Sequence, residues 1–203
     1  HALMGNHEPL LLSFAEGKLD INNAITNGLV KTAEQFTGLS AEKHGLQNVV
    51  NTFKRDFPKS KYYDWMKSRN IGVKIDNFFF SHSLPTDAIS LQDINDKHAY
   101  GLSEGMLSQY FMSEILWSRG QEAYGPEIAS RLGVDYLVIG HDPTRSGVIE
   151  RKGNVIDIDA GMTPRYKGKG GALIVDPNNF RSQMISVSSK APTYDLTLPG
   201  EGN

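Results

Sequence analysis

The chain of 203 residues contains no cysteine. This absence excludes disulfide bonds, thiolate zinc sites and a cysteine nucleophile. Any metal ion would have to be held by His, Asn, Asp or Glu, which suit Mn, Fe, Zn or Mg. No apolar run approaches about 18 residues, so we expect no membrane span. The formal net charge is only −2, so we expect no basic surface for nucleic acid.

The bulk composition is that of an ordinary soluble globular protein, with 39% hydrophobic and 22% charged residues. The chain is long enough for one domain with a sizeable core. Because it opens with His1, four residues before its strongest motif, we expect the true N-terminus to lie upstream. We predict one domain over 1–190 whose N-terminal part is absent from this chain, a mainly helical insert over 9–70, and a flexible tail over 191–203. The compartment and the oligomeric state stay open.

Hydrophobic periodicity predicts helices first, strands last and a mixed middle. The expected helices lie within 9–36, at 40–57 with Ser40 as a cap, at 62–66, at 90–97, at 103–115, and from Pro126 to Gly133. The expected strands are a hairpin of 71–75 and 78–81, then 136–139, 148–151, 155–158, 172–175 and 180–187. This order predicts an α/β fold, a sheet-centred domain covered by helices.

Three hydrophobic segments each end in a side chain that can bind a metal. Ala2-Leu3-Met4 runs into Gly5-Asn6-His7-Glu8, 78–81 runs into His82, and 136–140 runs into His141. Ligands at the carboxyl ends of neighbouring strands commonly build one shared site. An Asn carbonyl oxygen is a neutral, hard ligand, whereas His7 is suited to donate a proton near neutral pH.

Other polar residues are weighed against ordinary structural roles. Arg119 lies in Trp117-Ser118-Arg119-Gly120, where a guanidinium beside a glycine suits bidentate contact with phosphate. The weaker candidates for phosphate contact are Arg145 and Arg165. We expect His44 and His98 to be exposed. The glycines at 168, 170 and 171 indicate a hairpin loop, because no helix follows and no lysine stands at P-loop spacing.

These motifs together resemble the calcineurin-like metallophosphoesterases, in their phosphoprotein phosphatase branch. Gly5-Asn6-His7-Glu8, His82 and Gly140-His141 match three family motifs in order, and the segments 117–120 and 159–162 look like the bacterial-type, Shewanella-like members. The resemblance spans most of 1–187. The family's first two motifs, which supply the remaining metal ligands, do not occur in the chain.

The resemblance implies a four-layer αββα sandwich of two mixed sheets flanked by helices. It also implies two divalent metal ions, with Asn6, His82 and His141 as ligands of one of them. His7 would be the general acid and Arg119 would hold the phosphate.

The predicted function is a metal-dependent phosphomonoesterase in which a bridging hydroxide attacks phosphoserine, phosphothreonine or phosphotyrosine. Its partners would be phosphorylated proteins or small phosphomonoesters. One alternative is a dinucleoside polyphosphate or other nucleotide phosphohydrolase on the same fold. Others are a non-catalytic remnant that acts as a binding module, and a chain completed by a separate polypeptide that supplies the missing carboxylates.

Overall fold

A computed structural model describes residues 2–86, 115–162, 171–175, 182–186 and 194–196. Several sequence predictions lie outside these residues: the helix at 90–97, most of the helix at 103–115, and the residues His98, Arg165, Gly168 and Gly170.

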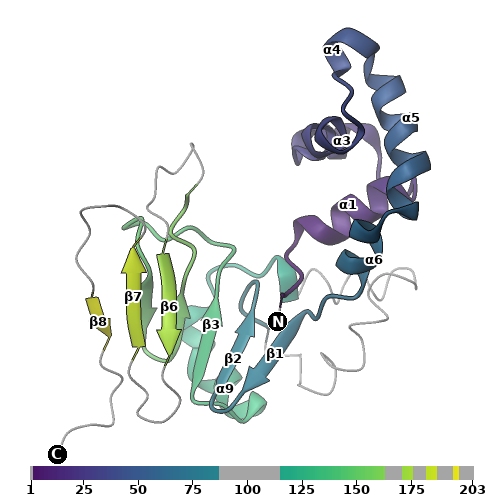
Figure 1. The fold of residues 1–203 in the computed structure, drawn as a ribbon. Coiled ribbons are helices and arrows are strands. Elements are labelled where there is room, and N and C mark those ends of the chain that lie inside the picture. The colour runs from purple at the N-terminus through teal and green to yellow at the C-terminus, as the bar shows by residue number, and fades with distance from the viewer. Residues whose placement is uncertain (1, 87–114, 163–170, 176–181, 187–193, 197–203) are drawn as a thin grey trace, which may run out of the picture.

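The N-terminal third is a unit of short helices, which stands to one side of the sheets (Figure 1). Its elements are α1 (His7–Ala15), α2 (Ile21–Thr26), α3 (Leu29–Thr37), α4 (Ala41–His44), α5 (Leu46–Asp56), η1 (Phe57–Lys59) and α6 (Lys61–Lys67). The helices expected within 9–36 are three separate ones, α1, α2 and α3. The predicted helix over 40–57 instead breaks at Gly45, whose φ is 81°, into α4 and α5.

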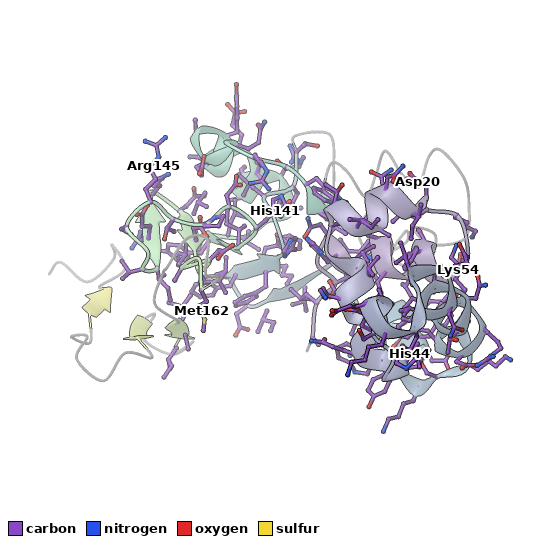
Figure 2. All side chains as sticks on the ribbon, turned by 90° about the horizontal axis from the view of Figure 1, so that it is seen from above. Asp20, His44, Lys54, His141, Arg145 and Met162 are labelled. Carbon is purple, nitrogen blue, oxygen red and sulfur yellow. The ribbon has the colours of Figure 1, made fainter. Side chains whose placement is uncertain are left out.

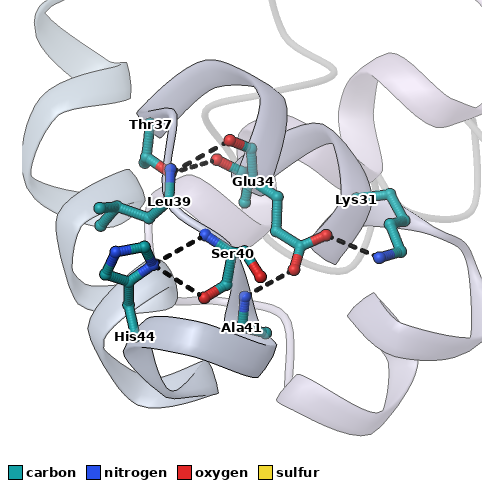
Figure 3. A network of polar contacts seen from close by, with 8 residues as sticks. Lys31, Glu34, Thr37, Leu39, Ser40, Ala41 and His44 are labelled. Carbon is teal, nitrogen blue, oxygen red and sulfur yellow. Dashed lines mark hydrogen bonds and ion pairs between the residues drawn. The ribbon is translucent and has the colours of Figure 1, made fainter.

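Ser40 was predicted to cap a helix with its side chain, and the structure shows a different cap. The Ser40 side chain makes no capping hydrogen bond. The backbone N–H of Ala41 donates to Glu34 Oε1 over 2.7 Å, and Lys31 pairs with the same carboxylate over 2.8 Å (Figure 3). The long-range carboxylate therefore replaces the local hydroxyl as the cap of α4.

The described strands form two sheets. Five strands form a mixed sheet in the order β1-β2-β3-β5-β4: β1 (Gly72–Ile75), β2 (Phe78–Ser81), β3 (Tyr136–Ile139), β4 (Glu150–Lys152) and β5 (Val155–Asp157). A second, antiparallel sheet has the order β6-β7-β8: β6 (Gly171–Val175), β7 (Ser182–Ser186) and β8 (Tyr194–Leu196). The predicted hairpin and the strand 136–139 are confirmed.

Within the mixed sheet, β2, β3 and β5 run parallel. Their carboxyl ends therefore meet at one edge of the sheet.

Alternate residues of β2 and β3 point to opposite faces of the sheet, which buries both faces. Between β2 and β3 the chain forms η2 (Glu122–Tyr124) and α9 (Gly125–Leu132). Phe79 and Leu137 belong to the core on one face of the sheet, to which α9 contributes Ile128. Phe78 and Val138 pack on the other face, where Leu173 of β6 contacts them as part of a second cluster. Gly125 begins α9, one residue before the predicted Pro126, and Gly133 ends the helix as predicted.

The α/β class is thus confirmed as a mixed sheet flanked by helices, whereas the four-layer sandwich of two mixed sheets is not confirmed. The second sheet is antiparallel in its described strands. The short strand expected at Ala2–Met4 is reduced to a single parallel bridge between Leu3 and Asn70, because the chain turns at Gly5 into α1.

Among the described residues, no helix is long and apolar enough to cross a membrane.

Candidate functional site

Strand pairing brings the ends of β2 and β3 together and places His82 beside His141. The Gly140 N–H donates to the carbonyl oxygen of His82 over 2.9 Å, so the two loops are joined directly after the strands. The imidazole atoms His82 Nε2 and His141 Nδ1 lie 3.1 Å apart. Two histidines that are separated by 59 positions in the sequence therefore share one site.

Asn6 completes this cluster from the N-terminal segment. Its side chain is buried, and its Oδ1 lies 2.9 Å from His82 Nε2. Because an amide oxygen only accepts, His82 donates from Nε2 in this arrangement. Gly5 lets the segment approach, since a Cβ there would lie 2.9 Å from Glu8 Oε2 and 3.1 Å from His82 Nδ1. Asn6, His82 and His141 thus converge as the sequence motifs indicate.

The backbone of His141 has a conformation that is uncommon for a residue with a side chain. Its φ is 74°, and the N–H of Asp142 donates to the carbonyl oxygen of Gly140 over 3.0 Å. This tight turn is rare and strained outside glycine. Strain of this kind is retained where the surrounding structure needs the geometry, which is common at functional sites.

The segment 117–120 lies against the same turn. The Trp117 ring meets the His141 ring edge-on, with 5.6 Å between centroids. Arg119 forms an ion pair with Asp142, the residue after His141. Arg119 is therefore within electrostatic reach of the cluster, as the sequence indicates, but its guanidinium is engaged by a carboxylate that the sequence did not reveal.

Burial and neighbouring positive charge keep both cluster histidines neutral at pH 7. Burial lowers the pKa of His82 to about 4, and the charges of His141, His7 and Arg119 add to this effect. Burial likewise lowers the pKa of His141 to about 4, with Arg119 adding to the effect and Asp159 opposing it. The cluster therefore offers neutral nitrogen and oxygen atoms rather than fixed charges.

His7 is the first residue of α1, and its side chain is exposed. Its charge affects the pKa of both His82 and His141, which places it at the edge of the cluster. It makes no hydrogen bond or ion pair with another described residue. The exposed His7 imidazole is therefore accessible to a ligand at the edge of the cluster.

A cavity of about 720 Å³ opens beside the cluster, and both Arg119 and Asp142 line it. Arg145 lines it as well, but it is exposed and pairs with no described residue. Burial and nearby carboxylates raise the pKa of Asp157, another lining residue, to about 7, against a hydrogen bond from the Asp159 N–H. The raised pKa of Asp157 was not predictable from the sequence, because it depends on which carboxylates pack around the end of β5.

His44 lies far from this site, on the helical unit, while His141 and Arg145 belong to the sheet part (Figure 2). His44 is exposed, as predicted, and its Nδ1 faces the backbone of Ser40.

Comparison with known proteins gives a fold relationship and no family. No family model matches the chain, and no curated protein matches it. A point mutant of a cold-active protein tyrosine phosphatase is similar at 19% identity and a TM-score of 0.65, over 97% of this chain and 58% of that one. A cold-active protein-tyrosine phosphatase of a psychrophilic Shewanella species is similar at 17% identity and a TM-score of 0.55, over 97% and 58%.

At these identities the likeness shows the fold alone. The chain spans less than three fifths of the length of these structures, 58% in both cases.

The comparisons contradict two of the predictions. The assignment to the calcineurin-like metallophosphoesterases is wrong, because the similar structures are named as protein tyrosine phosphatases and no family model matches.

The predicted pair of divalent metal ions (Mn, Fe, Zn or Mg) is contradicted as well. In the part of the chain that the structure describes, no group of three or more His, Asp or Glu side chains could hold a metal ion. The Asn6, His82 and His141 cluster has only two such side chains. Other carboxylates of the region, such as those of Asp142 and Asp157, line the neighbouring cavity.

Proposed function

We propose that the chain carries the phosphate-binding part of a phosphomonoesterase that acts on phosphoproteins, with phosphotyrosine as the preferred residue. The observation that supports it most is the convergence of Asn6, His82 and His141 beside Arg119 at the carboxyl ends of β2 and β3. The similar solved structures are named as protein tyrosine phosphatases, which favours this reading of the site.

In the proposed reaction, Arg119 binds the phosphoryl oxygens, because a guanidinium matches their geometry and carries a permanent charge. In this proposal water is the nucleophile, and the chain has no cysteine that could attack in its place. The water oxygen forms a bond to phosphorus while the bond between phosphorus and the ester oxygen breaks, and one proton of the water passes to a phosphoryl oxygen, so that dihydrogen phosphate is the product. His7 donates its proton to the departing phenoxide or alkoxide oxygen, a step typically worth about 10²–10⁴-fold.

The neutral cluster suits this reaction because it leaves the positive charge to Arg119. Both imidazoles and the Asn6 amide present polar atoms without adding a carboxylate that would repel the phosphate dianion. The large cavity next to Arg119 leaves room for the leaving group, which in a phosphotyrosine substrate is an aromatic ring.

The assay uses the full chain with p-nitrophenyl phosphate and with matched phosphotyrosine and phosphoserine peptides. We expect His7→Ala to lower kcat by about 10²-fold or more, because the leaving oxygen loses its proton donor. Arg119→Ala is expected to raise KM and lower kcat. His44→Ala is the matched control, since it removes an exposed histidine of the helical unit, and its turnover should equal that of the wild type.

Unchanged turnover of His7→Ala would remove His7 from the reaction. Phosphate binding without any turnover would instead support a non-catalytic binding module.

Two structural proposals accompany this function. The contact of Leu173 with the Phe78 and Val138 face supports a stacking of the two sheets as the inner layers of a four-layer arrangement. We also retain one domain over 1–190 with a helical insert over 9–70, while β8 lies within the segment 191–203 that was expected to be a tail.

A further inference from the structure

Arg119 already holds an anion that belongs to the chain itself. Its Nη1 contacts Oδ1 of Asp142, and both side chains are partly exposed, at 56% and 31%. The proposed function needs a phosphoryl group at this guanidinium. In the structure, a carboxylate therefore occupies the position that a ligand phosphate would take.

The backbone fixes this carboxylate in place. The turn from Gly140 to Asp142, with His141 at a φ of 74°, directs the imidazole toward His82 and the following side chain toward Arg119. Thr144, two residues on, anchors the loop by donating its N–H to the Asp159 carbonyl over 2.8 Å. Because the turn is anchored at both ends, Asp142 stays close to Arg119 even when the ion pair opens.

The charged side chains that line the surrounding cavity also act on an anion that approaches Arg119. Its lining has three cationic side chains (Arg119, Arg145, Lys152) and four acidic ones (Glu122, Asp142, Glu150, Asp157). Lys152 is already paired with Glu122 over 3.4 Å. A phosphate that approaches Arg119 therefore meets local repulsion, and the nearest source of it is Asp142.

We propose that Asp142 is a specificity-determining residue that competes with phosphate for Arg119. The inference rests on the proposed function only in taking phosphate as the ligand. A ligand must displace the carboxylate, so a phosphoryl dianion competes well whereas singly charged anions do not. The same competition limits how tightly the product, inorganic phosphate, is retained after hydrolysis.

Titration calorimetry of the full chain with inorganic phosphate tests this directly. We expect Asp142→Asn to bind phosphate about tenfold more tightly than the wild type, which corresponds to ~1.4 kcal/mol. Asp142→Ser is a second variant, with a smaller side chain, and should gain affinity in the same direction. In an Arg119→Ala background, Asp142→Asn should give no gain, because the competed group is gone.

Glu150→Gln is the matched control. It removes the same charge from the same cavity, but Glu150 faces the backbone N–H of Ser146 rather than Arg119. We expect it to change phosphate affinity by no more than about twofold. An equal gain in Glu150→Gln would show a general charge effect and overturn the proposal.

Equal or weaker phosphate binding by folded Asp142→Asn and Asp142→Ser would overturn it too, and would make Asp142 a residue that positions Arg119. Failure of the proposed function is a separate result: the affinity changes could occur in a chain that turns over no phosphoester.

Discussion

At the scale of single residues, two glycines next to the cluster differ in the space around them. A Cβ at Gly5 would lie 2.9 Å from Glu8 Oε2 and 3.1 Å from His82 Nδ1, whereas a Cβ at Gly140 would meet its nearest atom, the His82 carbonyl oxygen, at 3.6 Å. Both separations at Gly5 are tighter than ordinary van der Waals contact, while the one at Gly140 is normal. Neither glycine has a positive φ, so the difference is one of space alone.

We therefore predict that Gly5→Ala lowers kcat/KM for p-nitrophenyl phosphate by about tenfold, because the His82 imidazole must shift, and small displacements of site groups cost this much or more. Gly140→Ala should change it by less than about threefold. Thermal melting of both variants is the control for folding. Equal loss in the two variants would show that the contact with His82 does not matter.

Residue-scale reasoning from the sequence found Asn6, His82, His141 and Arg119 but not their electrostatic setting. Strand endings are local signals, so the two histidines could be placed at neighbouring strand ends once β2 and β3 were recognised. The ion pair of Arg119 with Asp142 joins residues 23 positions apart and depends on how two loops pack. No spacing in the sequence encodes that contact.

At the scale of elements, the helical unit has a core of its own. Phe53 of α5 is fully buried, and its ring stacks on Phe57 with 4.6 Å between centroids and on Phe14 with 5.8 Å. Phe36 of α3 contacts Phe53 edge-on at 5.7 Å. These rings belong to a cluster separate from the one between the sheet and α9, so α5 holds the helices together.

Phe53→Ala should lower the free energy of unfolding by about 3–5 kcal/mol, because it leaves a cavity among three other rings. Tyr62→Ala is the matched control, since the Tyr62 ring also contacts Phe36 but is 53% exposed, and it should cost less than about 1 kcal/mol. Urea denaturation followed by circular dichroism measures both. Similar losses in the two variants would contradict the assignment of Phe53 as the centre of this core.

Element boundaries were predictable where one strong local signal acts. Pro126 lies in the first turn of α9 and Gly133 follows its last residue, and the turn at 76–77 separates β1 from β2. The break at Gly45 and the pairing of β8 with β7 were missed. Gly45 is itself a local signal for a break, because glycine readily adopts the positive φ of 81° found there. A three-residue strand such as β8, in contrast, exists only because its partner is in place.

At the scale of the whole molecule, the site lies where the start of the helical unit meets the carboxyl ends of the parallel strands β2 and β3. Asn6 and His7 come from the start of α1, whereas His82 and His141 follow β2 and β3. The α/β class followed from the order of periodic segments, while the number of layers did not, because sheet stacking leaves no local signal. The family resemblance failed for a related reason: short motifs fix a local constellation and do not establish common descent or a metal complement.

The pH dependence of the cluster belongs to this scale, because burial by several elements causes it. The pKa of each cluster histidine is about 4 in the folded chain, below its ordinary value of about 6.5 in an unfolded chain. The unfolded state therefore binds more protons between these values. The stability contributed by the neutral imidazoles is complete above about pH 6.5 and is lost as the pH falls toward 4.

The central claim is that four side chains form one phosphate site: Asn6, His82, His141 and Arg119. A phosphate titration followed by the side-chain NMR signals of the histidines tests it most directly. At about pH 7.5 the two cluster imidazoles are neutral and inorganic phosphate is mostly the dianion, so a phosphate on Arg119 brings negative charge close to both. We predict that His82 and His141 shift together along one binding curve, while His44 on the helical unit does not move, and that Arg119→Ala abolishes the shifts. Unperturbed His82 and His141 signals at saturating phosphate, or shifts equal to those of His44, would contradict the account.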